Sequence, residues 1–143
     1  KNYDFYAVNF ANPDMVGHTG VLEAGIKAME FLDVQLGRLY EEIKNQEGFM
    51  IITSDHGNLE EMINPMTKEP DTEHNIYPAP FIIVSPHLKR ENPSPIKIED
   101  MAKMPSGTLA DIMPTILELY GIPMPEIKIY PDDKGSSLLQ RLK

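Results

Sequence analysis

Residues 49–58 of the chain read Phe49-Met50-Ile51-Ile52-Thr53-Ser54-Asp55-His56-Gly57-Asn58. The first half of this stretch is apolar on both faces, which is typical of a central strand in a parallel sheet covered by helices. The second half changes at once to polar residues and glycine, which is typical of a turn. Because open α/β sheets bind ligands beyond the carboxyl ends of their strands, this turn is a candidate binding site.

The elements around this stretch predict an α/β fold. From about Gly20 to Asn45 an apolar residue recurs every three to four positions, which predicts a long amphipathic helix. The short apolar runs 4–10 and 81–84 predict two further strands. A second helix is expected over residues 108–120, with Pro114 either kinking it or delaying its start. This order of elements predicts a mostly parallel sheet of three or more strands, flanked by helices.

Composition excludes several classes of protein. The 143 residues include 13 basic and 22 acidic side chains, a net charge of −9, which argues against nucleic acid or an anionic membrane as the main partner. The absence of cysteine excludes a disulfide framework, a thiolate nucleophile and cysteine-based metal sites. No apolar run approaches the roughly 20 residues that span a bilayer, and we expect a cytoplasmic protein. Prolines and charges crowd residues 86–107, which predicts a surface excursion of unknown role.

A second polar cluster follows the first predicted strand and reads Asn12-Pro13-Asp14-Met15-Val16-Gly17-His18-Thr19-Gly20. Asp14 and His18 are four residues apart, which places a carboxylate and an imidazole on one side of a helical turn. An alternative is a helix-capping aspartate beside an incidental histidine.

Three further side chains extend the candidate site. Asp55 and His56 are adjacent, and a tight turn can aim both at one point above the sheet, although a plain polar turn remains the alternative. His74 taken alone is typical of a surface histidine. Together with Asp14 and His18, these side chains form a set of two carboxylates and three imidazoles, which suits Mn²⁺, Zn²⁺ or Fe²⁺.

The two clusters together resemble the 2,3-bisphosphoglycerate-independent phosphoglycerate mutases of the alkaline phosphatase superfamily. The first cluster is the more specific of the two, because Ser-Asp-His-Gly alone indicates only the superfamily. The later segments Leu109-Ala110-Asp111-Ile112-Met113-Pro114-Thr115 and Gly135-Ser136-Ser137-Leu138-Leu139 resemble the closing helix and tail of that family. The resemblance therefore runs along nearly the whole chain and implies an alkaline-phosphatase-like fold.

The resemblance also implies a metal assignment and a reaction. Asp14, His18 and His74 would bind one Mn²⁺ or Mg²⁺, while Asp55 and His56 would bind a second. The family moves a phosphate between the hydroxyls of 3-phosphoglycerate and 2-phosphoglycerate in glycolysis, through a phosphoserine intermediate. One departure lies beside His74, where Asn75-Ile76-Tyr77 replaces the family's usual threonines.

A larger departure is what the 143 residues lack. The family's serine nucleophile, one ligand of the second metal and the substrate-holding domain all precede the matching stretch. Residues 1–143 are thus expected to be the C-terminal part of the metal-binding domain, with no catalytic nucleophile, an incomplete second site and no mutase activity alone. We also expect such a part to self-associate through uncovered surface. Two alternatives are another phosphomutase or phosphatase of the superfamily and a non-catalytic metal-binding or interaction module.

Overall fold

The computed structural model describes residues 3–88, 103, 105–125 and 135–141. The chain divides into two compact units, Lys1–Glu91 and Asn92–Lys143. Most of the proline-rich segment predicted as a surface excursion lies outside the described residues. None of the helices that the structure describes combines the length and the apolar character needed to cross a bilayer.

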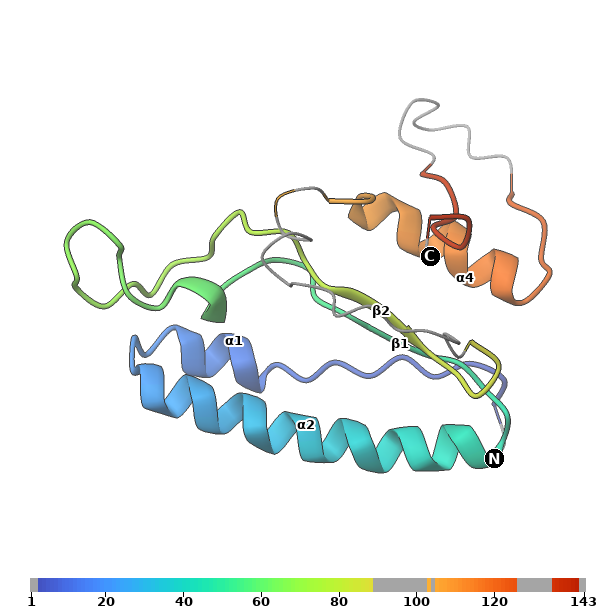
Figure 1. The fold of residues 1–143 in the computed structure, drawn as a ribbon, viewed down its shortest axis with the longest axis horizontal. Helices are drawn as coiled ribbons and strands as arrows, with labels where there is room; N and C mark the ends of the chain where they lie inside the picture. Colours follow the sequence, from blue (N-terminus) through green and yellow to red (C-terminus); the bar gives the residue numbers. More distant parts are fainter. Residues whose placement is uncertain (1–2, 89–102, 104, 126–134, 142–143) are drawn as a thin grey trace. The chain divides into compact units, whose positions relative to one another are not determined.

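Two helices open the first unit. The short helix α1 (Asn12–Gly17) begins with a proline in its first turn, where the missing N–H costs no hydrogen bond. The long helix α2 (Leu22–Asn45) confirms the helix predicted from its apolar period. Between them Gly20 has a φ of 66°, a left-handed conformation that glycine adopts at little cost. This tight turn brings α1 alongside the first turns of α2 (Figure 1).

The turn η1 (Leu59–Glu61) follows the first strand, and its Leu59 side chain lies against Gly25 of α2. A Cβ added at Gly25 of α2 would lie 2.6 Å from the sulfur of Met62. Met62 is almost fully buried, with 3% of its surface exposed. The lack of a side chain at Gly25 therefore lets the segment after the first strand dock closely on α2.

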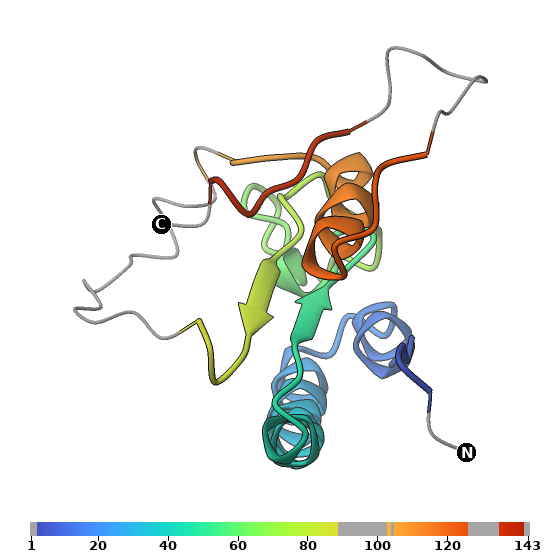
Figure 2. The ribbon, with the colours of Figure 1, turned by 90° about the vertical axis from the view of Figure 1, so that its right-hand side faces the viewer.

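The sheet differs from the prediction. Strand β1 (Met50–Thr53) pairs with β2 (Phe81–Val84) in an antiparallel register that sets Met50 opposite Val84 and Thr53 opposite Phe81. Figure 2 shows the two strands as arrows pointing in opposite directions. Both predicted strands exist, but their antiparallel pairing does not show the mostly parallel sheet that was expected.

The third predicted strand, over residues 4–10, does not form in the described part of the chain. Within the described part of the chain, residues 4–10 run without joining the sheet. Phe5, Tyr6 and Val8 all expose more than half of their surface. An apolar run becomes a strand only when a neighbouring strand pairs with its backbone, and the sheet of the described residues has just two strands. Neither strand of this sheet is buried along its length, unlike a strand in the centre of a parallel sheet.

The second unit contains the other predicted helix. A 3₁₀ turn, η2 (Leu109–Asp111), leads into α4 (Ile112–Leu119). Thr108 and Asp111 form a reciprocal capping box at the start of η2. Pro114 lies in the first turn of α4, so of the two outcomes predicted for this proline the helix starts late. Gly121 ends it with a φ of 65°.

Candidate metal centre

Helix α1 supplies the first two candidate ligands. Asp14 lies in its first turn and His18 caps its end, so the spacing of four residues places both side chains on one side of the helix. Oδ1 of Asp14 and Nε2 of His18 are 3.4 Å apart. The predicted carboxylate–imidazole pair therefore forms.

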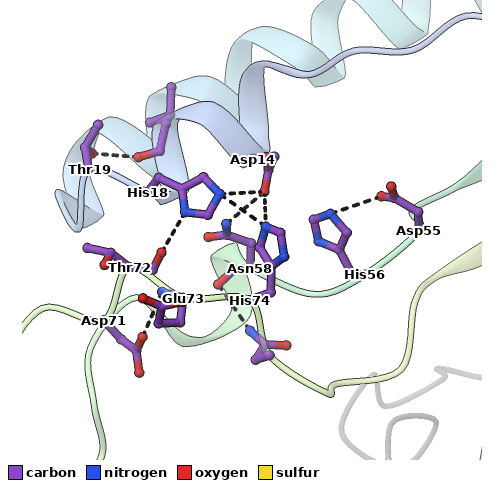
Figure 3. Close-up of polar contacts among 12 residues, drawn as sticks. Asp14, His18, Thr19, Asp55, His56, Asn58, Asp71, Thr72, Glu73 and His74 are labelled. Atoms are coloured by element: carbon purple, nitrogen blue, oxygen red, sulfur yellow. Dashed lines mark hydrogen bonds and ion pairs between the residues drawn. The ribbon is translucent and has the colours of Figure 1, made fainter.

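The segment before β2 brings His74 to this pair. Nε2 of His74 lies 3.0 Å from Oδ1 of Asp14 and 3.1 Å from Nε2 of His18. Figure 3 shows the three side chains converging on one point from two segments that are distant in the sequence. Among the described residues, Asp14, His18 and His74 form the one group of three acidic or imidazole side chains close enough to hold a metal ion.

The spacing of these three atoms fits one bound cation. Ligand atoms about 2.1 Å from an ion lie about 3.0 Å apart at right angles and about 3.4 Å apart in a tetrahedron. The three observed separations run from 3.0 to 3.4 Å. Two imidazoles with one carboxylate suit Mn²⁺, Zn²⁺ or Fe²⁺ and leave coordination positions open.

The outer nitrogen of His18 orients its ring. Nδ1 of His18 lies 2.6 Å from the carbonyl oxygen of Thr72. Because a carbonyl oxygen only accepts hydrogen bonds, this contact places a proton on Nδ1, and in the neutral ring Nε2 then carries a lone pair. Histidines that bind metals characteristically donate their second ring N–H in this way. The tautomer of His18 is therefore the one that a metal ligand requires.

Charge at the site comes from Asp14. Partial removal from water acts to raise the pKa of Asp14, but the hydrogen bond from Asn58 and the nearby rings of His18 and His74 outweigh it. The pKa of Asp14 therefore lies below its ordinary value of 3.8. At neutral pH the carboxylate is ionised and offers a cation one full negative charge.

Asp55 and His56 lie beside this group but outside it. The ring of His56 stacks on that of His74, with centroids 3.8 Å apart and an angle of 24° between the planes. Nε2 of His56 is 3.6 Å from Oδ1 of Asp55, and the Asp55 side chain is 87% exposed. Among the described residues no third acidic or imidazole side chain joins this pair in a metal-binding group. The role of both residues as ligands of a second metal stays a prediction.

Only one ring nitrogen of His56 is accessible for binding a metal ion. Nδ1 of His56 is buried and has no hydrogen-bond partner among the described residues. Nε2, which faces the exposed carboxylate of Asp55, is consequently the nitrogen placed for a ligand.

Two residues of the site were not identified from the sequence. Asn58, which is 6% exposed, donates from Nδ2 to Oδ1 of Asp14 at 2.9 Å. Asn75 donates from Nδ2 to the carbonyl oxygen of Asn58 at 3.2 Å. In the sequence Asn58 is a plausible turn residue and Asn75 a departure from a familiar pattern, so neither carries a local signal of its role.

The chain is similar to several known proteins. The family model described as Metalloenzyme superfamily matches residues 1–124. The chain is 46% identical over 126 residues to the 2,3-bisphosphoglycerate-independent phosphoglycerate mutase of Thermomicrobium roseum, covering 88% of the chain and 23% of that protein. It is 40% identical over 139 residues to the enzyme of the same name from Agrobacterium fabrum, covering 97% of the chain and 24% of that protein.

A solved structure is similar as well. A crystal structure of Leishmania mexicana phosphoglycerate mutase at low cobalt concentration matches with a TM-score of 0.66 and 30% identity. The match covers 90% of the chain and 23% of that protein. The chain thus spans about a quarter of the length of the relatives it matches, and it shares their alkaline-phosphatase-like fold over that part.

Proposed function

The chain belongs to the Metalloenzyme superfamily, and we propose that it is the C-terminal, metal-binding part of a 2,3-bisphosphoglycerate-independent phosphoglycerate mutase. The reaction proposed for the longer protein is the glycolytic interconversion of 3-phosphoglycerate and 2-phosphoglycerate in the cytoplasm. The observation that carries the proposal is the convergence of Asp14, His18 and His74, whose ligand atoms lie 3.0–3.4 Å apart. The mutases named above, with up to 46% identity, support it.

We assign these three side chains to one divalent cation, with Mn²⁺ preferred and Mg²⁺ possible. The cobalt named for the Leishmania mexicana mutase supports a divalent ion. Asp55 and His56 supply two ligands of a second ion, whose remaining ligand comes from outside the 143 residues. When bound, such cations neutralise charge on a transferring phosphoryl group and activate its nucleophile.

The chain's own residues prepare this site. Asp14 stays ionised because its neighbours lower its pKa. His18 presents Nε2 because the Thr72 carbonyl accepts its other proton. The serine nucleophile and the groups that hold the substrate are assigned to a part of the longer protein outside these residues. We also propose that further strands of that part extend β1 and β2 into a mostly parallel sheet.

A chimaera tests the function directly. We expect the chain, exchanged for the segment that it matches in the Thermomicrobium roseum mutase, to yield an enzyme that converts 3-phosphoglycerate to 2-phosphoglycerate with Mn²⁺. The same chimaera carrying His18→Ala should lose nearly all activity, because one ligand of the proposed site is gone. The 143-residue chain alone should give no turnover in the same coupled assay.

Each arm has an outcome that contradicts the proposal. A folded chimaera without activity, beside an active parent enzyme, would reject the mutase assignment. Turnover by the chain alone at the rate of the parent enzyme would show that no nucleophile is missing.

The exposed apolar surface of the first unit predicts self-association of the isolated chain. Phe31 on α2 is 68% exposed, an unusual state for a large aromatic side chain in a protein that acts alone. We expect a concentration-dependent rise in mass by size-exclusion chromatography with light scattering. Large apolar side chains exposed elsewhere on this unit include Tyr3, Phe5, Tyr6, Val8, Val21, Leu22, Ile26, Met29, Val34 and Leu39.

A charge placed on this surface provides the control. Phe31→Glu should shift the equilibrium toward monomer, whereas Lys27→Glu, at an exposed polar position of the same helix, should have a smaller effect. A monomer at all concentrations up to about 1 mM, where weak association is detectable, would reject the prediction.

A further inference from the structure

Gly17, the last residue of α1, lies directly against the side chain of Asn58. A Cβ built on Gly17 would overlap Oδ1 of Asn58 and would lie 2.6 Å from its Cγ. No residue but glycine leaves room for the amide here. The same amide donates from Nδ2 to Oδ1 of Asp14 at 2.9 Å. The bare Cα of Gly17 therefore admits the group that holds the Asp14 carboxylate in place.

An equivalent contact lies one residue before Asn58. A Cβ built on Gly57 would overlap Oδ1 of Asn75 and would lie 2.9 Å from its Cγ. Three hydrogen bonds hold Asn75 in this position: its N–H donates to the Gly57 carbonyl at 3.0 Å, its Nδ2 donates to the Asn58 carbonyl at 3.2 Å, and its Oδ1 accepts from Tyr77 N–H at 3.1 Å.

The two contacts are linked in series because Gly57 and Asn58 are adjacent in the chain. Gly17 to Asn58 joins the end of α1 to the turn after β1, and Gly57 to Asn75 joins that turn to the segment before β2. Each of the three joined segments carries a candidate ligand next to the contact. These neighbours are His18 after Gly17, His56 before Gly57, and His74 before Asn75.

We propose that these two glycine–asparagine contacts set the distances between the candidate metal ligands, so that Gly17, Asn58, Gly57 and Asn75 are positioning residues of the metal site. The inference rests on the proposed function, since it assumes that Asp14, His18 and His74 hold the metal. Among the described residues, no backbone–backbone hydrogen bond joins α1 to either of the other two segments. The planar amide of Asn58, seated on the bare Cα of Gly17, fixes that separation and donates to a ligand at the same time.

A double-mutant cycle tests the first contact, with Mn²⁺ affinity measured by titration calorimetry. Gly17→Ala and Asn58→Ala should each weaken Mn²⁺ binding about 10–100-fold, the usual effect of losing a residue that orients a metal ligand. The double variant should bind no more weakly than Asn58→Ala alone, because removal of the amide makes room for the new methyl group. Gly37→Ala is the control, because an added Cβ there meets nothing within 4 Å, and it should leave affinity unchanged.

Measurements on the metal-free protein separate this inference from the proposed function. Without Mn²⁺, the losses of stability of Gly17→Ala and Asn58→Ala, measured by thermal unfolding, should not add up in the double variant. Long-range ¹H–¹⁵N spectra of Gly17→Ala should show a change in the signals of the Nδ1-protonated ring of His18. If the wild-type chain binds no Mn²⁺, the proposed metal function is rejected. The metal-free cycle then tests only whether Gly17 and Asn58 are energetically coupled.

Two results would overturn the inference. The first is that folded Gly17→Ala binds Mn²⁺ with the affinity of wild type. The second is that the changes in unfolding free energy caused by Gly17→Ala and Asn58→Ala are strictly additive. If Gly17→Ala fails to fold, Asn75→Ala replaces it, since it breaks the second contact without touching α1. Asn75→Ala should also weaken Mn²⁺ binding about 10-fold or more, and unchanged affinity would reject the role of that contact.

Discussion

Replacing His18 with alanine is expected to lower the affinity of the chain for Mn²⁺ by about 100-fold or more, beyond the effect of losing a residue that only orients a ligand. The substitution removes one of the three side chains whose ligand atoms lie 3.0–3.4 Å apart. It leaves Asp14 and His74, which can hold a divalent cation only weakly. The side chain of His18 is 44% exposed, so we expect little change in the stability of the fold.

Titration calorimetry checks this expectation, with His87→Ala as the matched control. His87 is also an exposed imidazole of the first unit, but it lies outside the metal-binding group of the described residues. His87→Ala should bind Mn²⁺ as wild type does. Equal Mn²⁺ affinity of His18→Ala and wild type would reject the assignment of the first site.

Acidification should release Mn²⁺ for a related reason. Imidazole binds a metal only in its neutral form, so protons compete with the ion at His18 and His74. Asp14 adds little to this dependence near neutrality, because its pKa lies below its ordinary value of 3.8 and it stays ionised.

The sequence predicted those parts of the fold that a local pattern encodes. The apolar period of α2 identified a helix whose bounds agree with the structure, because such a stripe needs only one neighbouring surface to pack on. The apolar run over residues 4–10 carried a strand signal of similar quality, yet it does not join the sheet within the described part of the chain. A strand depends on a partner elsewhere in the chain, and no local pattern contains that information.

In the candidate site, too, local patterns predicted some residues, whereas others depend on distant parts of the chain. Asp14 and His18 could be paired from the sequence because helical spacing brings them together. His74 could be added to the ligand set from the sequence, but its assignment to the same metal as Asp14 and His18 came only from the resemblance to a known family. The structure places Nε2 of His74 3.0 Å from Oδ1 of Asp14. Asn58 was missed because its contact with Asp14 spans 44 residues and depends on a glycine that leaves space rather than on one that forms a turn.

The largest effect on stability is expected from Asp111, far from the metal site in the sequence. Its side chain is 7% exposed, and its carboxylate accepts hydrogen bonds from the backbone N–H groups of Thr108 and Ser136. Its backbone carbonyl accepts from the hydroxyl of the fully buried Thr115 at 2.6 Å, and that hydroxyl in turn accepts from Leu138 N–H at 2.8 Å. Asp111 thus joins the start of α4 to the tail at residues 135–141.

Asp111→Asn should lower the free energy of unfolding of this unit by about 3 kcal/mol at pH 7, since hydrogen bonds to a charged group are worth about 1.5–3 kcal/mol each. Asparagine keeps the shape of the side chain but turns an N–H₂ group toward one of the two backbone donors. That donor then loses its hydrogen-bond acceptor. Urea unfolding followed by circular dichroism measures the loss, with Glu118→Gln at an exposed position of α4 as the control.

The pH dependence of this loss of stability separates the contribution of the ionised Asp111 carboxylate from that of side-chain packing. The N–H groups of Ser136 and Thr108 lower the pKa of Asp111 below its ordinary value of 3.8 and outweigh the effect of burial. A group whose pKa falls on folding stabilises the folded state above its unfolded pKa and loses that contribution as the pH drops through its folded pKa. The difference in stability between wild type and Asp111→Asn should therefore be full at pH 7 and should shrink below about pH 4. A difference that stays constant from pH 7 to pH 3 would mean that the ionised carboxylate does not hold the tail, because asparagine has no proton to gain in this range.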